Sequence, residues 1–416
     1  MTRRSVTRAT LAAVFVLLLA ASPSVGQDRG PGNLPRRHLT VKLFPFLPTV
    51  SPSNFGFLLE RITREFEAEN PEVGLTVIIE QNCYEHDAYH MDPEKSMVPT
   101  DANVFEIDLI RLEEFAPYLA ELTAIDEHVF PAADTAAHLG TKRYAIPTWV
   151  CTEFLFGRDP HLKEITSVDD LRGLLDKGVN GHRKLTGDFA GHFTLSALYA
   201  HAFVETSDNG PRTVGDAMTT ELEPNTVTNL ARLVAECTDE KKDNPCIDGK
   251  FHSQDADGPL REFQGGALAL AGYSETLFDV LVRENKTQDR DIVEIDLPLG
   301  PHPTPVIWVD GLVINRSNCP TQCQQDAIAF ARYMNRPSTR HWICFSGDLP
   351  KGAPPRYLLP ARQDFYDLPD VKNDPHYQAF LATVARAVPF PSAGYESFYQ
   401  HVHKDLEKKV RGQETK

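Results

Sequence analysis

Residues 39–80 contain a strand–helix–strand pattern, which constrains the fold more than any other part of the sequence. LTVKLFP at residues 39–45 is an apolar strand that stops at a proline, and VGLTVIIE at residues 73–80 is a second apolar strand. Between them, SPSNFGFLLERITREFEAENP repeats apolar residues at helical spacing until Pro71 ends the helix. A third apolar strand, VFEIDLI, follows at residues 104–110. Continuous apolar strands that alternate with helices indicate a parallel sheet covered on both faces.

A change of pattern after residue 111 predicts a second α/β lobe. YAIPTWVCTEFLFGR is expected to be a pair of strands at which the chain crosses between lobes. The segments that follow are helices at 167–178, 193–205 and 225–240, strands at 293–299 and 306–315, and a helix at 326–335. This order predicts two lobes hinged by more than one crossing, with a ligand crevice between them at the carboxyl ends of strands. Lobe 1 is predicted to comprise residues 38–148 and 296–346, and lobe 2 residues 149–295 and 347–416.

The first 26 residues are expected to be an export signal. They combine a basic start, an uncharged apolar run and small residues before position 27. Their removal changes the formal charge from −16 to −19, because residues 1–26 hold three arginines and no acidic residue. Such an acidic chain is poorly suited to nucleic acid or anionic membrane surfaces, and it attracts a cationic small molecule. We expect an exported monomer without a membrane anchor, in the periplasm or the medium.

The chain has seven cysteines, an odd number for an exported protein. Cys237 and Cys246 flank a polar loop that a disulfide could close, and Cys319 and Cys323 could pair across a helix start. Three cysteines remain, so at least one thiol stays free within a monomer.

Cys151, one of these three, follows Pro147 in the apolar run YAIPTWVCTEFLF, and two interpretations of it are open. Free cysteine is among the most buried residue types, which favours a small apolar side chain that fills a core. The alternative is a nucleophile at a strand end. Because only the thiolate attacks, that role requires a base nearby.

The motif GYSE offers such a base. Gly272 interrupts a short apolar strand before a helix, so that Tyr273 and Glu275 fall where the crevice is expected. Partial burial would raise the pKa of Glu275 toward that of a general base. The competing interpretation is that Ser274 and Glu275 only cap the helix.

Two aspartates lie in or at the end of apolar strands, Asp108 in VFEIDLI and Asp310 in VIWVDGLVIN. A carboxylate inside such a run must be compensated or must face a ligand. As a pair in a very acidic chain, they suit a ligand with a cationic or amino-bearing ring. Each alone is equally compatible with a structural role.

The segment CYEHDAYH contains Cys83, His86, Asp87 and His90 at spacings that a metal could use. No second cluster of convincing spacing accompanies it. We therefore favour a crevice loop whose Tyr84 and Asp87 face a ligand, and we assign no metal.

The order of these elements resembles the periplasmic solute-binding proteins of the maltose-binding type. The opening strand, its helix, the E-x-x-N-P-x-V turn and the second strand match their first lobe, and LPARQDFY at residues 359–366 resembles the return to their second lobe. The resemblance implies a two-lobed type II α/β fold with a ligand cleft between the lobes.

The cysteine and GYSE motifs, in this order on this fold, resemble the thiaminase I (thiamine pyridinylase) family of exported enzymes. The resemblance implies that Glu275 takes the proton of Cys151, whose sulfur adds to the pyrimidine ring of thiamine and allows the thiazole to leave from the bridging methylene. An amine, pyridine or thiol co-substrate then accepts the pyrimidine. No cofactor is implied.

The same resemblance implies which residues bind thiamine. Asp108 and Asp310 match cleft aspartates in segments like FEID and WVDGLVIN, and would hold the aminopyrimidine. Tyr273 would pack against the rings of thiamine. In CYEHDAYH, Tyr84 would pack against the rings in the same way. The alternative function is a non-catalytic solute-binding protein for thiamine or another small molecule, which needs neither a free thiol nor a base beside it.

Overall fold

The first strand–helix–strand unit forms as predicted. The structure, a computed structural model, describes residues 36–45, 47–50, 54–79, 101–123, 128–176, 184–191, 194–206, 213–218, 221–240, 242–301 and 303–412. Within it, β1 (Arg37–Leu43) and β2 (Val73–Ile79) pair in parallel along their whole length, connected by α1 (Asn54–Glu69). The apolar stripe of α1 is buried at Leu58, Ile62 and Phe66. The helical spacing in the sequence is therefore the spacing of the core contacts.

The larger sheet continues with four further strands: β3 (Val104–Asp108), β6 (Ala145–Cys151), β11 (Val306–Ile314) and β12 (Val388–Pro389). Its order is β12-β11-β3-β1-β2, and β6 pairs with β11. β3 is parallel to β1, whereas β11 runs antiparallel to both β3 and β6. The sheet is thus mixed, because β11 returns from a distant part of the chain in the opposite direction.

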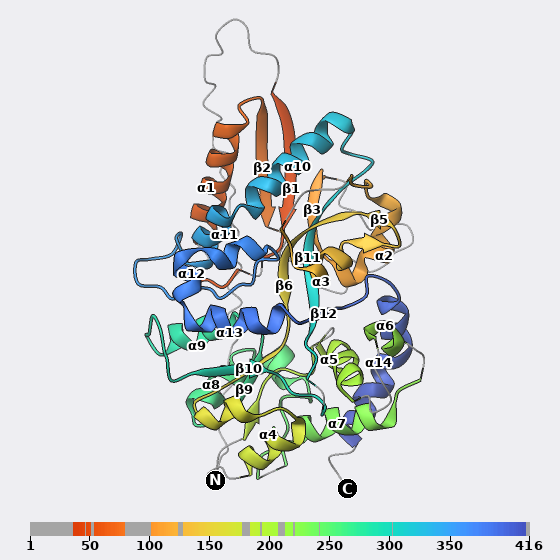
Figure 1. Ribbon diagram of the computed structural model, residues 1–416, viewed down its shortest axis with the longest axis vertical. Helices are drawn as coiled ribbons and strands as arrows, with labels where there is room; N and C mark the ends of the chain where they lie inside the picture. The colour runs from red at the N-terminus through yellow and green to blue at the C-terminus, as the bar shows by residue number, and fades with distance from the viewer. Residues whose placement is uncertain are drawn as a thin grey trace, which may run out of the picture. The chain divides into compact units, whose positions relative to one another are not determined.

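The smaller sheet has the order β10-β7-β9-β8. Its strands are β7 (Phe154–Gly157), β8 (Leu185–Thr186), β9 (Ala269–Gly272) and β10 (Val293–Asp296). The chain passes from the larger to the smaller sheet between Cys151 and Phe154, within the strand pair where a crossing is predicted (Figure 1). A short hairpin of β4 (His138–Leu139) and β5 (Lys142–Arg143) completes the described strands.

Helices cover both sheets. They are α2 (Leu112–Phe115), α3 (Pro131–Ala136), α4 (Val168–Leu175), α5 (Thr194–Glu205), α6 (Val214–Ala217), α7 (Pro224–Ala235), α8 (Gly258–Gln264), α9 (Thr276–Arg283), α10 (Thr321–Asn335), α11 (Pro337–Cys344), α12 (Pro369–Asn373), α13 (Pro375–Val384) and α14 (Tyr395–Gly412). α1 packs on β2 and α10 on β1, whereas α5, α7 and α14 pack on one another (Figure 1).

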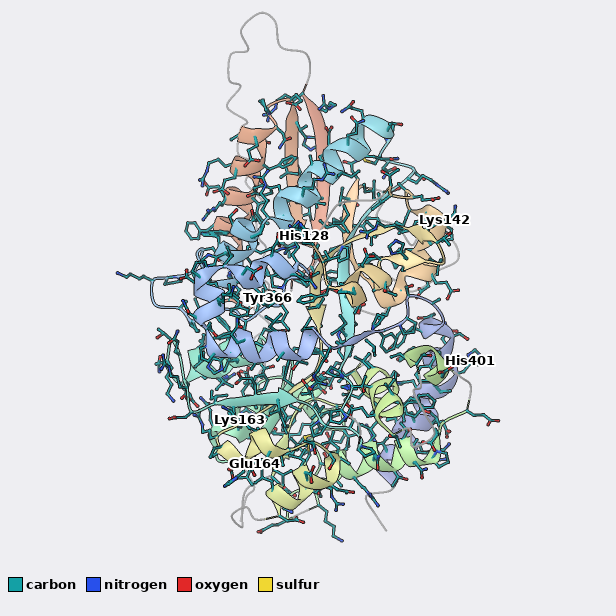
Figure 2. All side chains as sticks on the ribbon, in the orientation of Figure 1. His128, Lys142, Lys163, Glu164, Tyr366 and His401 are labelled. Atoms are coloured by element: carbon teal, nitrogen blue, oxygen red, sulfur yellow. A yellow bond between two sulfur atoms is a disulfide. The ribbon has the colours of Figure 1, made fainter. Side chains whose placement is uncertain are left out.

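Buried apolar side chains form two clusters, one centred on the larger sheet and one on β8, β9, α5, α7 and α14. Tyr366, labelled in Figure 2, belongs to the first cluster. Its ring lies edge-on to that of Phe130, and its hydroxyl donates a hydrogen bond of 3.3 Å to the carbonyl oxygen of Pro360. The segment LPARQDFY is therefore held in place by the packing of the Tyr366 ring and by the hydrogen bond of its hydroxyl.

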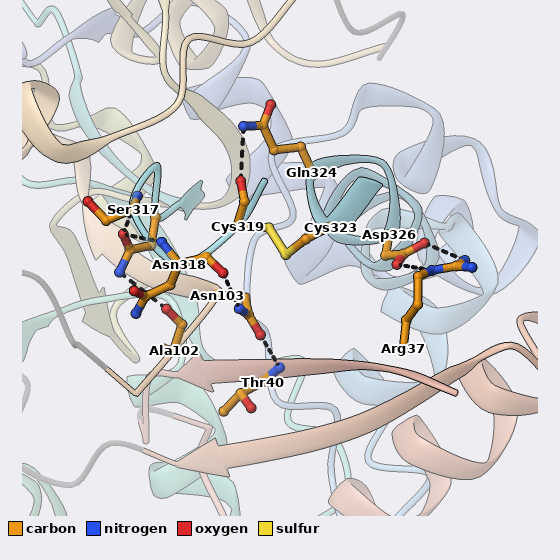
Figure 3. Close-up of a disulfide and its surroundings, with 11 residues drawn as sticks. Arg37, Thr40, Ala102, Asn103, Ser317, Asn318, Cys319, Cys323, Gln324 and Asp326 are labelled. Atoms are coloured by element: carbon orange, nitrogen blue, oxygen red, sulfur yellow. Dashed lines mark hydrogen bonds and ion pairs between the residues drawn. A yellow bond between two sulfur atoms is a disulfide. The ribbon is translucent and has the colours of Figure 1, made fainter. Parts of the chain in front are cut away.

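Both cysteine pairs expected from the sequence form disulfides. The Cα atoms of Cys237 and Cys246 are 6.2 Å apart, and those of Cys319 and Cys323 are 5.0 Å apart, both within the range that a disulfide spans. The second bridge joins the segment after β11 to the first turn of α10. Figure 3 shows it together with hydrogen bonds from the Thr40 N–H to the Asn103 side chain (2.8 Å) and from that side chain to the Asn318 carbonyl (2.9 Å).

No helix within the described ranges is long and apolar enough to cross a membrane. The predicted export signal, residues 1–26, lies outside the described residues. Residues from Arg37 onward cluster into one compact unit that contains both sheets. The exact lobe boundaries stay a prediction.

Candidate active site

Three neighbouring strands bring the first group of candidate residues together. β11 lies between β3 and β6, with Asp310 directly opposite Asp108 on one side and Trp149 on the other. Cys151, at the end of β6, pairs with Trp308 of β11. The two aspartates and the cysteine, which are far apart in the sequence, therefore share one edge of the larger sheet.

A β-bulge supports this edge. The pairing of β6 with β11 shifts register between Asp310 and Gly311, which leaves Thr148 as the extra residue on β6. The Thr148 hydroxyl lies 3.0 Å from the carbonyl oxygen of Asp310 and 2.8 Å from a carboxylate oxygen of the buried Glu106. The backbone N–H of Phe44 also donates to Glu106, at 3.0 Å. These bonds fix the backbone that carries Asp310.

The turn between β9 and α9 places the second group. A Cβ atom at Gly272 would lie 2.5 Å from the Thr276 hydroxyl oxygen, so glycine permits this close turn. Glu275 immediately precedes α9, but its carboxylate makes no capping hydrogen bond to the helix. Instead it lies 3.5 Å from the Ser274 hydroxyl and faces a pocket. The side chain of Glu275 therefore does not cap the helix, and the interpretation of this residue as only a helix cap is wrong.

The candidate residues line one pocket. Its volume of about 380 Å³ is in the range of small-molecule binding sites. Five of the six predicted site residues line it: Asp108, Cys151, Tyr273, Glu275 and Asp310. The sixth, Tyr84, lies outside the described residues, as does the rest of CYEHDAYH. Elsewhere in the described ranges, no group of His, Cys, Asp and Glu side chains is arranged to hold a metal ion.

Three carboxyl groups of this pocket, those of Asp108, Glu275 and Asp310, have raised pKa values. Burial raises the pKa of Asp108, and burial together with the charge of Asp108 raises the pKa of Asp310 well above its ordinary value. Burial also raises the pKa of Glu275 to about 7. Near neutral pH the pocket can therefore both donate and accept protons, which is the property of a general acid–base site.

The residue Cys151 is only partly buried, in contrast to the buried Cys344, whose Sγ lies 3.6 Å from the Leu358 carbonyl oxygen. Burial is the main cause that raises the pKa of Cys151 well above its ordinary value, and the charges of Asp310 and Glu275 add to it. Cys151 thus lines the pocket rather than filling a sealed core. Its raised pKa means that the thiol is protonated near neutral pH and ionises when a base or a cation acts on it.

The aromatic wall is formed by Tyr273 and Trp308. Their ring centroids lie 5.8 Å apart in an edge-to-face arrangement. Burial and the carboxylates nearby raise the pKa of the Tyr273 hydroxyl well above its ordinary value, so this hydroxyl remains a hydrogen-bond donor.

Three polar residues of this region were not assigned a role from the sequence. Asp188 and His252 line the pocket, and Glu153 is buried two residues after Cys151. Burial and the charges of Glu275 and Asp188 raise the pKa of Glu153 to about 8. Asp188 lies two residues after the end of β8, so the rule that ligands bind at the carboxyl ends of strands would have found it. No local pattern marks Glu153 or His252.

Comparison with known proteins identifies the family and the fold of the chain. Residues 61–379 match the sequence profile of the bacterial extracellular solute-binding proteins. Thiaminase-1 of Paenibacillus thiaminolyticus is 27% identical over 259 residues, which cover 58% of this chain. The aligned segment spans 57% of that relative, little more than half of its length.

Solved structures of the same fold extend over nearly the whole chain. Clostridium botulinum thiaminase I in complex with thiamin superposes with a TM-score of 0.68 at 20% identity, covering 91% of this chain and 100% of that one. Maltose-bound MalE3 of T. maritima gives a TM-score of 0.63 at 16% identity, covering 91% and 98%. The chain therefore has the two-lobed α/β fold of these proteins, as expected from the sequence.

Proposed function

The chain belongs to the family of bacterial extracellular solute-binding proteins, and we propose that it uses the ligand pocket of that fold as the active site of an exported, thiaminase I-like transferase. The observation that carries the proposal is that a free cysteine, the partly exposed Cys151, lines one pocket together with Glu275, whose carboxyl has a pKa of about 7. Solute capture alone requires neither group. The similarity to Thiaminase-1 of Paenibacillus thiaminolyticus supports thiamine as the substrate.

The paired aspartates suit the amino edge of a pyrimidine. Asp310 and Asp108 are direct neighbours across two strands, and both have raised pKa values. Two close, buried carboxyls favour a state with one proton and one negative charge. The ionised member accepts a hydrogen bond from the exocyclic amino group, and the protonated member donates one to the adjacent ring nitrogen. Tyr273 and Trp308 supply aromatic surface for the ring.

The charge of the pocket favours unphosphorylated thiamine. Its described lining includes the carboxyl groups of Asp108, Asp188, Glu275 and Asp310, and contains no lysine or arginine. A cationic thiazolium is attracted to such a site, whereas a phosphate is repelled. The cation also offsets the carboxylates that keep the Cys151 thiol protonated. Binding of thiamine therefore lowers the free energy needed to form the thiolate.

The chemistry then runs in two halves. Glu275 takes the thiol proton, and the Cys151 sulfur forms a bond to C6 of the pyrimidine. The electrons pushed into the ring break the bond from the bridging methylene to the thiazolium nitrogen, which releases neutral thiazole. In the second half a nucleophile bonds to the methylene, the C–S bond breaks, and the thiolate recovers its proton from Glu275.

Incubation of the purified protein with thiamine and pyridine tests the proposal, with mass spectrometry of free thiazole and of the pyrimidine–pyridine product. Cys151→Ala should release no thiazole but retain thiamine binding by calorimetry. Cys344→Ala is the matched control, because this thiol is buried away from the pocket. Binding of thiamine without product from the unmodified protein would instead support the non-catalytic solute-binding alternative.

A further inference from the structure

A histidine–aspartate pair lies in the pocket in addition to Cys151 and Glu275. Nδ1 of His252 lies 2.9 Å from a carboxylate oxygen of Asp188, and both side chains line the pocket. The other Asp188 oxygen accepts a hydrogen bond of 3.1 Å from the backbone N–H of Ala190. Since an ionised carboxylate only accepts hydrogen bonds, Nδ1 carries the proton in this pair. Nε2 of the neutral ring is then left with a free lone pair.

The two halves of the proposed reaction need two separate proton acceptors. After the first half, Glu275 holds the proton from Cys151 until the thiolate leaves again. An amine or thiol that attacks the methylene in the meantime must lose a proton of its own. Glu275 is occupied at that moment, so another base must take this proton and deliver it to solvent.

We propose that His252, held by Asp188, is the base that deprotonates the incoming nucleophile. The acceptor lone pair forms the new bond to the methylene, its N–H or S–H proton passes to Nε2 of His252, and the ring electrons expel the Cys151 thiolate. The inference rests on the proposed function and adds the acceptor half of the site, with Asp188 as a positioning residue.

Exposure distinguishes this pair from Glu153, another carboxyl near Cys151. The side chains of His252 and Asp188 are 47% and 34% exposed, so a proton on His252 can pass to water. Glu153 is buried, and with a pKa of about 8 it already carries a proton at neutral pH. Of the acids and bases described around the pocket, the His252–Asp188 pair therefore best meets the requirements of a regenerating base.

Acceptor chemistry provides the test. Aniline must lose a proton when it is alkylated, whereas pyridine has no N–H and forms a pyridinium product without proton loss. We measure the ratio of kcat/KM for aniline to that for pyridine in the wild type and in His252→Gln. The ratio should fall about 100-fold in the variant, the usual contribution of a general base. Asp188→Asn, which keeps an acceptor for Nδ1 but removes the charge, should lower the ratio less.

His161→Gln is the matched control, because His161 also contacts a carboxylate, Glu164 (labelled in Figure 2), at 3.2 Å but on an exposed 3₁₀ turn outside the pocket. The inference would be overturned if the aniline-to-pyridine ratio of kcat/KM in His252→Gln equals the wild-type ratio. This includes the case in which kcat/KM falls equally with both acceptors. Failure of the wild type to release thiazole with either acceptor would instead refute the proposed function itself.

Discussion

Asp310 on β11 lies directly opposite Asp108 on β3, so two acidic residues are paired at the edge of the larger sheet. Asp108 is buried, and Asp310 is half-buried. Neither is compensated by a directly bonded cation among the interactions described for it, although Arg111 lies close enough to act on Asp108 electrostatically. Burying such a pair costs free energy unless a ligand or a proton relieves the repulsion. We infer that the pair is retained for binding, since a purely structural position would favour neutral residues.

The pair predicts a non-additive effect of mutation on thiamine affinity. At neutral pH the two carboxyls together carry about one negative charge, so an asparagine can replace the protonated member. In a Cys151→Ala background, Asp108→Asn and Asp310→Asn should each weaken thiamine binding less than tenfold, and the double variant about 100-fold or more. Isothermal titration calorimetry at pH 7.5 measures this, with the exposed Asp169→Asn as control. Full loss in each single variant would contradict the shared-proton arrangement.

The fold and most of the candidate site could be predicted from the sequence for a physical reason. Apolar periodicity predicted β1, α1 and β2, because burial on a sheet requires it, and polar residues at the ends of apolar strands identified Asp108, Glu275 and Asp310. The antiparallel direction of β11 was not predictable, because strand periodicity is the same in both directions. His252 was not predicted as a candidate site residue, because it is marked only by a tertiary contact, with Asp188, and not by its neighbours in sequence.

Cys151 should react slowly with a neutral alkylating reagent. Burial and the charges of Asp310 and Glu275 raise its pKa, so little thiolate is present at pH 8 in the absence of ligand. Replacing both Asp108 and Asp310 by asparagine removes the negative charge that the pair shares and should accelerate carboxamidomethylation by iodoacetamide roughly tenfold. Mass spectrometry of the peptide that contains Cys151 follows the reaction and separates it from the other thiols. An unchanged rate in this double variant would show that the two aspartates do not act on the thiol.

The pKa of Glu275 predicts how the rate of thiamine cleavage changes on the acidic side of the pH–rate profile. With a pKa of about 7, it is protonated and unable to take the thiol proton at lower pH. Therefore kcat/KM for thiamine should rise with pH and level off above about 7. Glu275→Gln should lower kcat/KM by about 10²–10⁴-fold and abolish this rise. Thiamine binding to Cys151→Ala over the same pH range separates chemistry from affinity, and a rise that persists in Glu275→Gln would assign it to another group.

The raised pKa of Glu153 predicts that ionisation of this side chain makes the folded protein less stable at high pH. Its pKa is raised from 4.5 to about 8, chiefly by burial, so the folded protein retains a proton that the unfolded chain loses above pH 4.5. Its contribution to stability is therefore full below pH 4.5 and is lost as the pH rises through about 8. Glu153→Gln cannot ionise and should raise the free energy of unfolding at pH 9 by roughly 2–4 kcal/mol relative to its effect at pH 4. Urea unfolding at both pH values measures the difference. The control variant Glu164→Gln, at an exposed position, should show no such difference between the two pH values. An equal effect of Glu153→Gln at both pH values would mean that Glu153 ionises as freely in the folded protein as in the unfolded chain.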